Sequence, residues 1–562
     1  FNIILSIFFI IIFFLFKNIK HYRNYFINLI NISKLSLVFI FIYSALAIIY
    51  GEQYYSFRGN HWDYFNYITS SLAISEYNIE YIKRNIVNLQ EAYPYKGMGW
   101  LLHLEIRPSI NIFYSLFYKL KIENLYLVGF ILKSYGMFLI FSASSIFFYK
   151  LLKFSKTKIL ALAYIFTFSF WTIYIFEIDA LSNLYGQSIF IYCLYLLLRV
   201  EEIVKTKNIN DKIIFIVACL SLFLIYPELF AVYILLSCIY LILSNKFFYI
   251  FVTNQNNFFL LLIIFIFLSL PFYNYVHKFL IYQLSAGTSY SNLWGYFGSF
   301  ILGKESSILN NEFVTTIKNI TVSDQNILGS IKKIIRQLIS EDYNFFFINL
   351  IPSLSGLYHL TFGKFTNIYE LIYIFLLLIL NIFIIKIILL NLKNIFKNEQ
   401  KEILLLKSVI ILFSILTIYL IFNQAFWSII KLYFYLSIFW FLILIINLKR
   451  DKKYSLNYLL LFLIVLFPIY FFTGIENGIG KRNSFPSIIK RDMKEKFNWT
   501  IPHSKISKCD KILIFGDKRH QEKYITTYLK YNNLKFEIIN SDLSILEKNQ
   551  CILKINNKFN LN

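Results

Sequence analysis

Long apolar runs, separated by short polar and basic segments, recur along most of the 562-residue chain. Many are long enough to enter or cross a bilayer, and the run Phe258–Leu270 lacks the polar–apolar alternation of a membrane β-strand. Backbone groups in lipid must be satisfied within their own segment, so these runs are predicted to be helices. The predicted spans are residues 1–16, 35–50, 125–149, 159–176, 186–200, 212–226, 229–244, 257–275, 369–391, 403–422, 428–447 and 456–473. We therefore expect a mostly α protein, a polytopic transmembrane bundle of about 11–13 spans.

After residue 473 the chain becomes more polar, and a small α/β domain is predicted at 474–562, behind a transmembrane domain at 1–473. Within it, Lys511–Gly516 (KILIFG) has the pattern of a buried strand. A helix is predicted over Gln521–Tyr531 and a second strand over Leu534–Ile539.

Cys509 and Cys551 lie in this tail. An extracytoplasmic tail permits a disulfide between them. The pairing of the strands cannot be read from the sequence, however, so separate cysteines are favoured. No cysteine spacing indicates a zinc site.

Composition and charge restrict the class of protein. Residues are 58% hydrophobic and 15% charged, far from the composition of an ordinary soluble domain. The net charge of +24 comes with basic residues gathered in short loops, a positive-inside pattern that argues against nucleic-acid binding. The basic loops are marked by Lys17, Lys20, Arg23 and Lys34; by Lys150, Lys153, Lys156 and Lys158; by Arg199, Lys205, Lys207 and Lys212; by Lys393, Lys397 and Lys401; and by Lys449, Arg450, Lys452 and Lys453.

One alternating path places all five basic loops on the cytoplasmic side. It leaves two long loops, 51–124 and 276–368, on the outer side together with the tail. The expected location is thus the plasma (inner) membrane, crossed many times, with the long loops and the C-terminal domain extracytoplasmic.

The first long loop begins with the most informative stretch, Arg58–Tyr67 (RGNHWDYFNY). Asp63, beside His61 and Tyr64, is a candidate general base if its aromatic neighbours desolvate it. Aromatic rings next to a carboxylate also suit a sugar, whose C–H faces stack on the rings. The competing interpretation is that Asp63 caps the apolar helix that follows it.

Further candidates lie at the outer ends of the predicted spans. Arg107 can bind a lipid phosphate through its two-pronged guanidinium, or it can simply sit at the membrane interface. Glu177 and Asp179 lie in a short turn and could join Asp63 in holding a divalent metal or an acceptor, or remain solvated.

A third acidic position follows a break in an apolar stretch. Tyr226-Pro-Glu228 interrupts the chain between two predicted spans, with Pro227 ending one helix and Glu228 beginning the next. An acid at a membrane boundary within a bundle is a candidate functional residue. The alternative is a simple turn whose acid is favoured by the helix dipole.

Taken together, the chain resembles the GT-C superfamily of polytopic membrane glycosyltransferases. The resemblance rests on an acid soon after the second span (Asp63), an acidic turn later (Glu177, Asp179) and a span-breaking Tyr226-Pro. A long late loop and an outer C-terminal domain complete it. It covers the chain from about residue 35 onward.

The resemblance implies a hexosyl- or pentosyltransferase that uses a polyprenyl-phosphate-linked sugar donor. Asp63 would be its catalytic base and Arg107 a phosphate ligand. The other substrate-binding residues implied are His61, Tyr64, Glu177, Asp179, Tyr226 and Glu228. The acceptor would be an envelope glycan, a lipid or a protein. Tyr64 follows Asp63 where some members place a second acid, so the need for a metal stays open.

Two other classes of function stay open. An O-antigen-type polysaccharide polymerase or ligase is also polytopic with a long outer loop, but the first-loop acid and the soluble tail favour GT-C. A transporter would carry paired mid-membrane acids or broken helices in its two halves. Tyr226-Pro-Glu228 has no such counterpart in the sequence.

Overall fold

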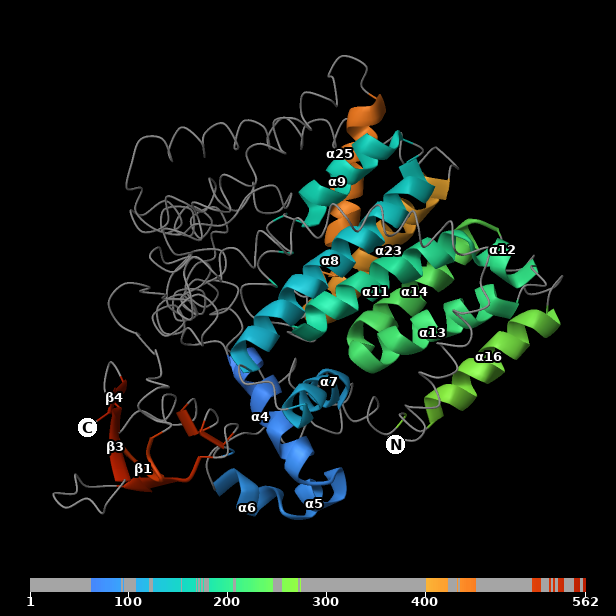
Figure 1. The fold of residues 1–562 in the computed structure, drawn as a ribbon. Coiled ribbons are helices and arrows are strands. Elements are labelled where there is room, and N and C mark those ends of the chain that lie inside the picture. Colours follow the sequence, from blue (N-terminus) through green and yellow to red (C-terminus); the bar gives the residue numbers. More distant parts are fainter. Residues whose placement is uncertain are drawn as a thin grey trace, which may run out of the picture.

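The computed structural model describes most of the chain between residues 62 and 273, parts of 401–450, and the strands of the tail (Figure 1). The described residues are 62–91, 95, 108–120, 125–152, 154–167, 169, 172, 175, 181–205, 209–245, 255–270, 273, 401–422, 432, 435–450, 508–516, 525–526, 529–530, 534–539, 550–555 and 559–561. The predicted spans 1–16, 35–50, 369–391 and 456–473 and the loop 276–368 lie outside these residues.

The described part is mostly helical, and the longest helices pack into a bundle (Figure 1). Its helices are α8 (Leu125–Leu152), α9 (Lys156–Thr167), α11 (Leu181–Leu198), α12 (Val200–Lys205), α13 (Ile209–Ile225), α14 (Pro227–Leu243), α16 (Gln255–Ser269), α23 (Lys401–Phe422) and α25 (Ser437–Arg450). Two of them are long and apolar enough to cross a membrane, over Ile131–Leu152 and Leu181–Leu198.

Helices α8 and α11 run in the same direction. At one end the Tyr185 hydroxyl donates to the Leu132 carbonyl oxygen at 3.0 Å. At the other end the Lys150 ammonium lies 3.1 Å from the Glu202 carboxylate, in the short helix α12 that follows α11. In both contacts the two joined residues are separated by nearly the same number of positions in the sequence. This separation stays nearly constant along a pair of helices only when the helices are parallel.

Helices α13 and α14 form a hairpin at the Tyr226-Pro break. Tyr226 is the single residue between them, and the Phe223 and Phe230 rings meet across the turn at 5.2 Å. Pro227 is the first residue of α14, where its missing N–H would have no helical partner anyway. The predicted break between two helices is confirmed, and the second helix begins at Pro227 rather than at Glu228.

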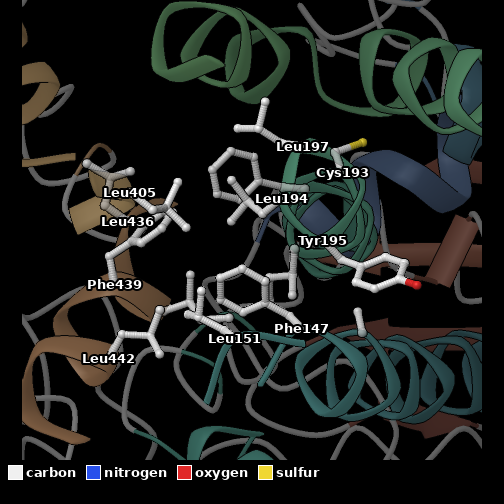
Figure 2. Close-up of a cluster of buried hydrophobic side chains, with 14 of the residues drawn as sticks. Phe147, Leu151, Cys193, Leu194, Tyr195, Leu197, Leu405, Leu436, Phe439 and Leu442 are labelled. Carbon is white, nitrogen blue, oxygen red and sulfur yellow. The ribbon is translucent and has the colours of Figure 1, made fainter. Parts of the chain in front are cut away.

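An apolar core lies between α8, α11, α14, α23 and α25 (Figure 2). The Phe147 and Phe439 rings meet edge to face at 6.5 Å, and Leu151, Leu194 and Leu436 fill the space around them. These residues come from segments nearly 300 positions apart, so the core fixes α25 against the earlier helices.

Four helices lie at one end of the bundle, where the sequence predicted a loop over 51–124 (Figure 1). They are α4 (Trp62–Glu76), α5 (Ile79–Arg84), α6 (Ile86–Glu91) and α7 (Pro108–Lys119). Asn78 caps α5 by accepting a hydrogen bond from the Tyr81 N–H at 2.7 Å, and Pro108 begins α7. The described part of the long segment 51–124 is therefore helical, and it includes the apolar helix expected after Asp63.

The tail contains a four-stranded sheet of order β2-β1-β3-β4. The strands are β1 (Lys511–Gly516), β2 (Phe536–Ile539), β3 (Gln550–Ile555) and β4 (Phe559–Leu561). Strands β2 and β3 are parallel to β1, and β4 is antiparallel to β3. The described residues between 525 and 530 are helical, so the predicted strand–helix–strand unit is confirmed.

A disulfide joins Cys509 and Cys551, with their Cα atoms 5.9 Å apart. The expectation of separate cysteines is wrong. Strand β3 pairs with β1, and its residue Cys551 lies opposite Ile512, three residues after Cys509. The neighbouring strands therefore bring the two sulfur atoms together across 42 residues of sequence.

One face of this sheet shares an apolar core with the helices α4–α7. Residues that alternate along the strands point to the same face. From the sheet and its helix come Ile512, Ile514, Leu553, Ile525 and Leu529; from the helices and the connection before α7 come Tyr67, Ile68, Leu72, Ile82, Tyr95, Ile110 and Tyr114. The C-terminal domain and the first-loop helices thus pack as one unit at the end of the bundle.

Candidate functional site at the end of the bundle

The first turn of α11 is joined to α4 by a buried hydrogen bond. The Tyr67 hydroxyl lies 2.7 Å from the Ser182 hydroxyl, and both residues are buried. Tyr67 is in the second turn of α4, and Ser182 is the second residue of α11. The bond fixes the start of the first-loop helix against the end of the bundle.

The second turn of α11 packs against the start of α14. A Cβ atom added at Gly186 would meet the Tyr226 Cβ atom at 2.7 Å, so only glycine fits without a shift of the backbone. Because Gly186 lies one turn after Ser182, these two contacts lie on neighbouring turns of the same helix. They bring α4 and the Tyr226-Pro turn to the same end of α11.

A buried polar network continues from Tyr226. The Tyr226 and Tyr435 hydroxyls are 2.8 Å apart, and their rings meet edge to face at 5.5 Å. The Gln187 amide donates to the Tyr435 carbonyl oxygen at 3.3 Å and approaches the Ser437 hydroxyl at 3.5 Å. In an apolar bundle such a network is stable because its polar atoms are paired with one another.

Asp63 and Glu228 lie on helices that contact one short stretch of α11, and Asp179 precedes that stretch in the sequence. Asp63 precedes Tyr67 by four residues, and Asp179 precedes Ser182 by three. Glu228 follows Tyr226 by two residues and lies in the first turn of α14, partly exposed. The contacts of Tyr67 and Tyr226 bring the starts of α4 and α14 to the first two turns of α11.

Asp63 is the second residue of α4 and Tyr64 the third. The described part of this helix begins at Trp62, which places Asp63 in its first turn. A carboxylate in a first turn is favoured by the helix dipole. The structure describes only the backbone of Asp63 and Tyr64, while His61, Arg107, Glu177 and Asp179 lie outside the described residues.

Tyr226 was singled out in the sequence, but Tyr67, Ser182, Gln187 and Tyr435, which assemble this end of the bundle with it, were not given site roles. Gln187 could have been recognised from the sequence, because it is an amide near the start of a strongly apolar helix. No feature of the sequence selects Tyr67, Ser182 or Tyr435 for a structural contact, because tyrosine and serine are common throughout the chain. Their importance comes from contacts between distant segments.

A second polar cluster joins α4 to the C-terminal domain. The Lys530 ammonium lies 2.8 Å from the Glu76 carboxylate, and the Tyr95 hydroxyl donates to the same carboxylate oxygen at 3.1 Å. Burial, with the nearby charge of Glu76 as a further cause, raises the pKa of Tyr95 well above its ordinary value, so its hydroxyl stays protonated and donates.

Among the described residues, no group of three or more His, Cys, Asp or Glu side chains is placed to hold a metal ion. In comparisons with known proteins, no family model, curated protein or solved structure matches this chain.

Proposed function

We propose that this chain is a multi-pass membrane glycosyltransferase of the GT-C type. It would move a sugar from a polyprenyl-phosphate donor to an envelope glycan, lipid or protein acceptor on the outer face of the plasma membrane. The observation that carries the proposal is the Tyr67–Ser182 hydrogen bond, which joins the helix of Asp63 to the helix that follows Glu177 and Asp179.

Exposed apolar side chains support a location of the bundle in lipid. Phe267 of α16 is 71% exposed, and large apolar residues project around that helix and from α23. A soluble protein rarely exposes so large an apolar surface. The side chains concerned are Phe259, Leu262, Ile263, Ile264, Ile266, Phe267 and Leu270 of α16 and its end, and Ile415, Ile418 and Tyr419 of α23.

The disulfide supports an extracytoplasmic C-terminal domain. Disulfides persist in oxidising compartments and are rare in the cytosol. The domain that holds Cys509–Cys551 packs on the first-loop helices, so these helices belong on the same side. At the other end of the bundle, Lys150 lies in the last turn of α8 and Arg199 lies between α11 and α12. Both belong to the basic segments that the positive-inside pattern assigns to the cytoplasm.

In the proposed reaction, Asp63 takes the proton of the acceptor hydroxyl as that oxygen attacks the anomeric carbon. The bond between the anomeric carbon and the phosphate oxygen breaks, and polyprenyl phosphate leaves with the electron pair. Configuration at the sugar inverts because displacement is direct. Arg107 would pair with the phosphate, and Glu177, Asp179 and Glu228 would bind the acceptor.

The test is transfer of radiolabelled sugar from a panel of polyprenyl-phosphate donors by the purified protein in detergent. We expect Asp63→Asn to lower the rate by about 10²–10⁴-fold, the usual contribution of a general base. Asp211→Asn is the matched control, because Asp211 also lies in the first turn of a helix, α13, but at the opposite end of the bundle.

Equal rates for the wild type and Asp63→Asn would reject Asp63 as the base. Absence of transfer from every donor would reject the glycosyltransferase and leave the polymerase, ligase or transporter. Loss of transfer in Asp211→Asn as well would show that a carboxylate in a first helical turn matters only for folding.

A further inference from the structure

Helix α4 is attached at two points along its length. Near its start, Tyr67 bonds to Ser182 of the bundle; at its last residue, Glu76 pairs with Lys530 of the C-terminal domain. Asp63 and Glu76 are 13 residues apart, about 20 Å along a helix. A helix of this length moves as a rigid rod, so a displacement at one end changes the position of the other.

The attachment at Glu76 is a compact polar cluster. The side chains of Glu76 and Lys530 are each 24% exposed, so water screens their pairing only partly. The Lys530 ammonium also lies 4.9 Å from the centre of the Tyr95 ring, whose hydroxyl bonds to Glu76. One ammonium thus holds a carboxylate and an aromatic face together.

An apolar contact surrounds this cluster and fixes its orientation. Leu529, next to Lys530, is fully buried in the core that the sheet shares with α4. Ile68 and Leu72 of α4 belong to the same core. The C-terminal domain therefore holds the side of α4 through apolar packing and its end through charge.

We propose that Glu76 and Lys530 are positioning residues, through which the C-terminal domain clamps α4 and keeps its first turn, with Asp63, in place at the end of the bundle. Neither residue touches the reacting atoms. The role given to Asp63 rests on the proposed function, whereas the clamp on α4 does not.

The test uses the full chain in detergent with Glu76→Lys, Lys530→Glu and the double exchange. Hydrogen–deuterium exchange is followed in peptides from α4 and from the start of α11. Each single reversal sets like charges against each other. It is expected to speed exchange about tenfold, both near Glu76 and at the distant contact between Tyr67 and Ser182. The double exchange restores the opposite pair and should restore protection at both places.

The matched control is Lys511→Glu, which replaces an exposed ion pair with Glu537 between β1 and β2 by two like charges. It should leave exchange in α4 and α11 unchanged. Faster exchange confined to the last turn of α4 in the single variants would overturn the clamp. Failure of the double exchange to restore protection would also overturn it.

Sugar transfer by the same proteins separates the clamp from the proposed function. A positioning role predicts a lower kcat in each single variant, an unchanged KM for the donor, and recovery of kcat in the double exchange. If the wild type transfers no sugar while exchange behaves as expected, the glycosyltransferase fails and the clamp stands. If exchange in α4 is insensitive to all three variants, the clamp fails whatever the activity.

Discussion

Gly186 and Tyr226 approach so closely that a Cβ atom on the glycine would lie 2.7 Å from the Cβ atom of the tyrosine. The Tyr226 Cβ is the base of a buried side chain, so it cannot move without moving the backbone. The closeness of α11 and α14 at this end of the bundle therefore depends on a glycine.

Gly186→Ala should destabilise the protein by about 1–3 kcal/mol, the usual cost of overpacking a core. Gly136→Ala is the matched control, since its new Cβ would lie 3.1 Å from Leu184 Cβ. There the helix-propensity gain of about 0.5–1 kcal/mol should offset most of the strain. Thermal unfolding in detergent measures both. Similar Tm values for the two variants would contradict the close contact.

The Tyr67–Ser182 bond can be isolated by a double-mutant cycle. Tyr67→Phe and Ser182→Ala each remove one hydroxyl of the 2.7 Å pair. We expect a coupling energy of about 0.5–1.5 kcal/mol between them, because a typical hydrogen bond contributes that much. Denaturant unfolding of the wild type, the two single variants and the double variant gives this energy. Strictly additive effects would show that the two hydroxyls do not interact.

Features set by neighbouring residues could be predicted from the sequence. Lys511–Gly516 is a strand with the predicted bounds, because a short β-rich apolar run has few alternatives. The Tyr226-Pro break was equally clear, since proline cannot continue the preceding helix. Helix α11 begins at Leu181, five residues before the predicted 186, because Leu184 and Tyr185 extend its packing against α8.

Features set by distant contacts could not be predicted. The pairing of β3 with β1 decides the Cys509–Cys551 bridge, and no local pattern encodes that pairing. Glu76 and Lys530 look like ordinary surface charges in a chain with 55 basic residues. Asp63 stood out because it lies among aromatic residues at the edge of an apolar segment.

The Cys509–Cys551 bridge should account for much of the stability of the C-terminal domain. Closing a loop of 42 residues lowers the entropy of the unfolded chain, an effect of about 4 kcal/mol. Cys509→Ser/Cys551→Ser should therefore make the tail sensitive to proteases at temperatures at which the wild-type tail resists them. Limited proteolysis over a temperature series measures the difference.

Alkylation provides an independent check of the bridge. Of the five cysteines, two form the disulfide and Cys193, Cys219 and Cys238 are free. The denatured wild type should therefore take up three alkyl groups without reductant and five after reduction. Five groups without reductant would show that the bridge does not form in the cell, and would remove the support it gives to an extracytoplasmic tail.

At the opposite end of the bundle, Glu202 should make stability depend on pH. Partial burial works against its ionisation, but hydrogen bonds from Arg199 and Lys150 outweigh burial and hold its pKa below the ordinary value of about 4.5. A carboxyl whose pKa is lower in the folded state adds stability above its unfolded pKa and loses it as the pH falls through the folded pKa. Glu202→Gln should thus lower the Tm at pH 7. This difference in Tm, the gap between the variant and the wild type, should disappear as the pH falls below about 4.5.

Thermal unfolding in detergent between pH 3 and 7 would follow this gap, with ionic strength held constant so that screening does not change. The control is the same comparison in a Lys150→Gln/Arg199→Gln background, where Glu202 has lost its two cationic partners. There the gap should be small at every pH. A gap that stays constant across the pH range in the wild-type background would mean that the ion pairs at this end of the bundle do not stabilise the fold.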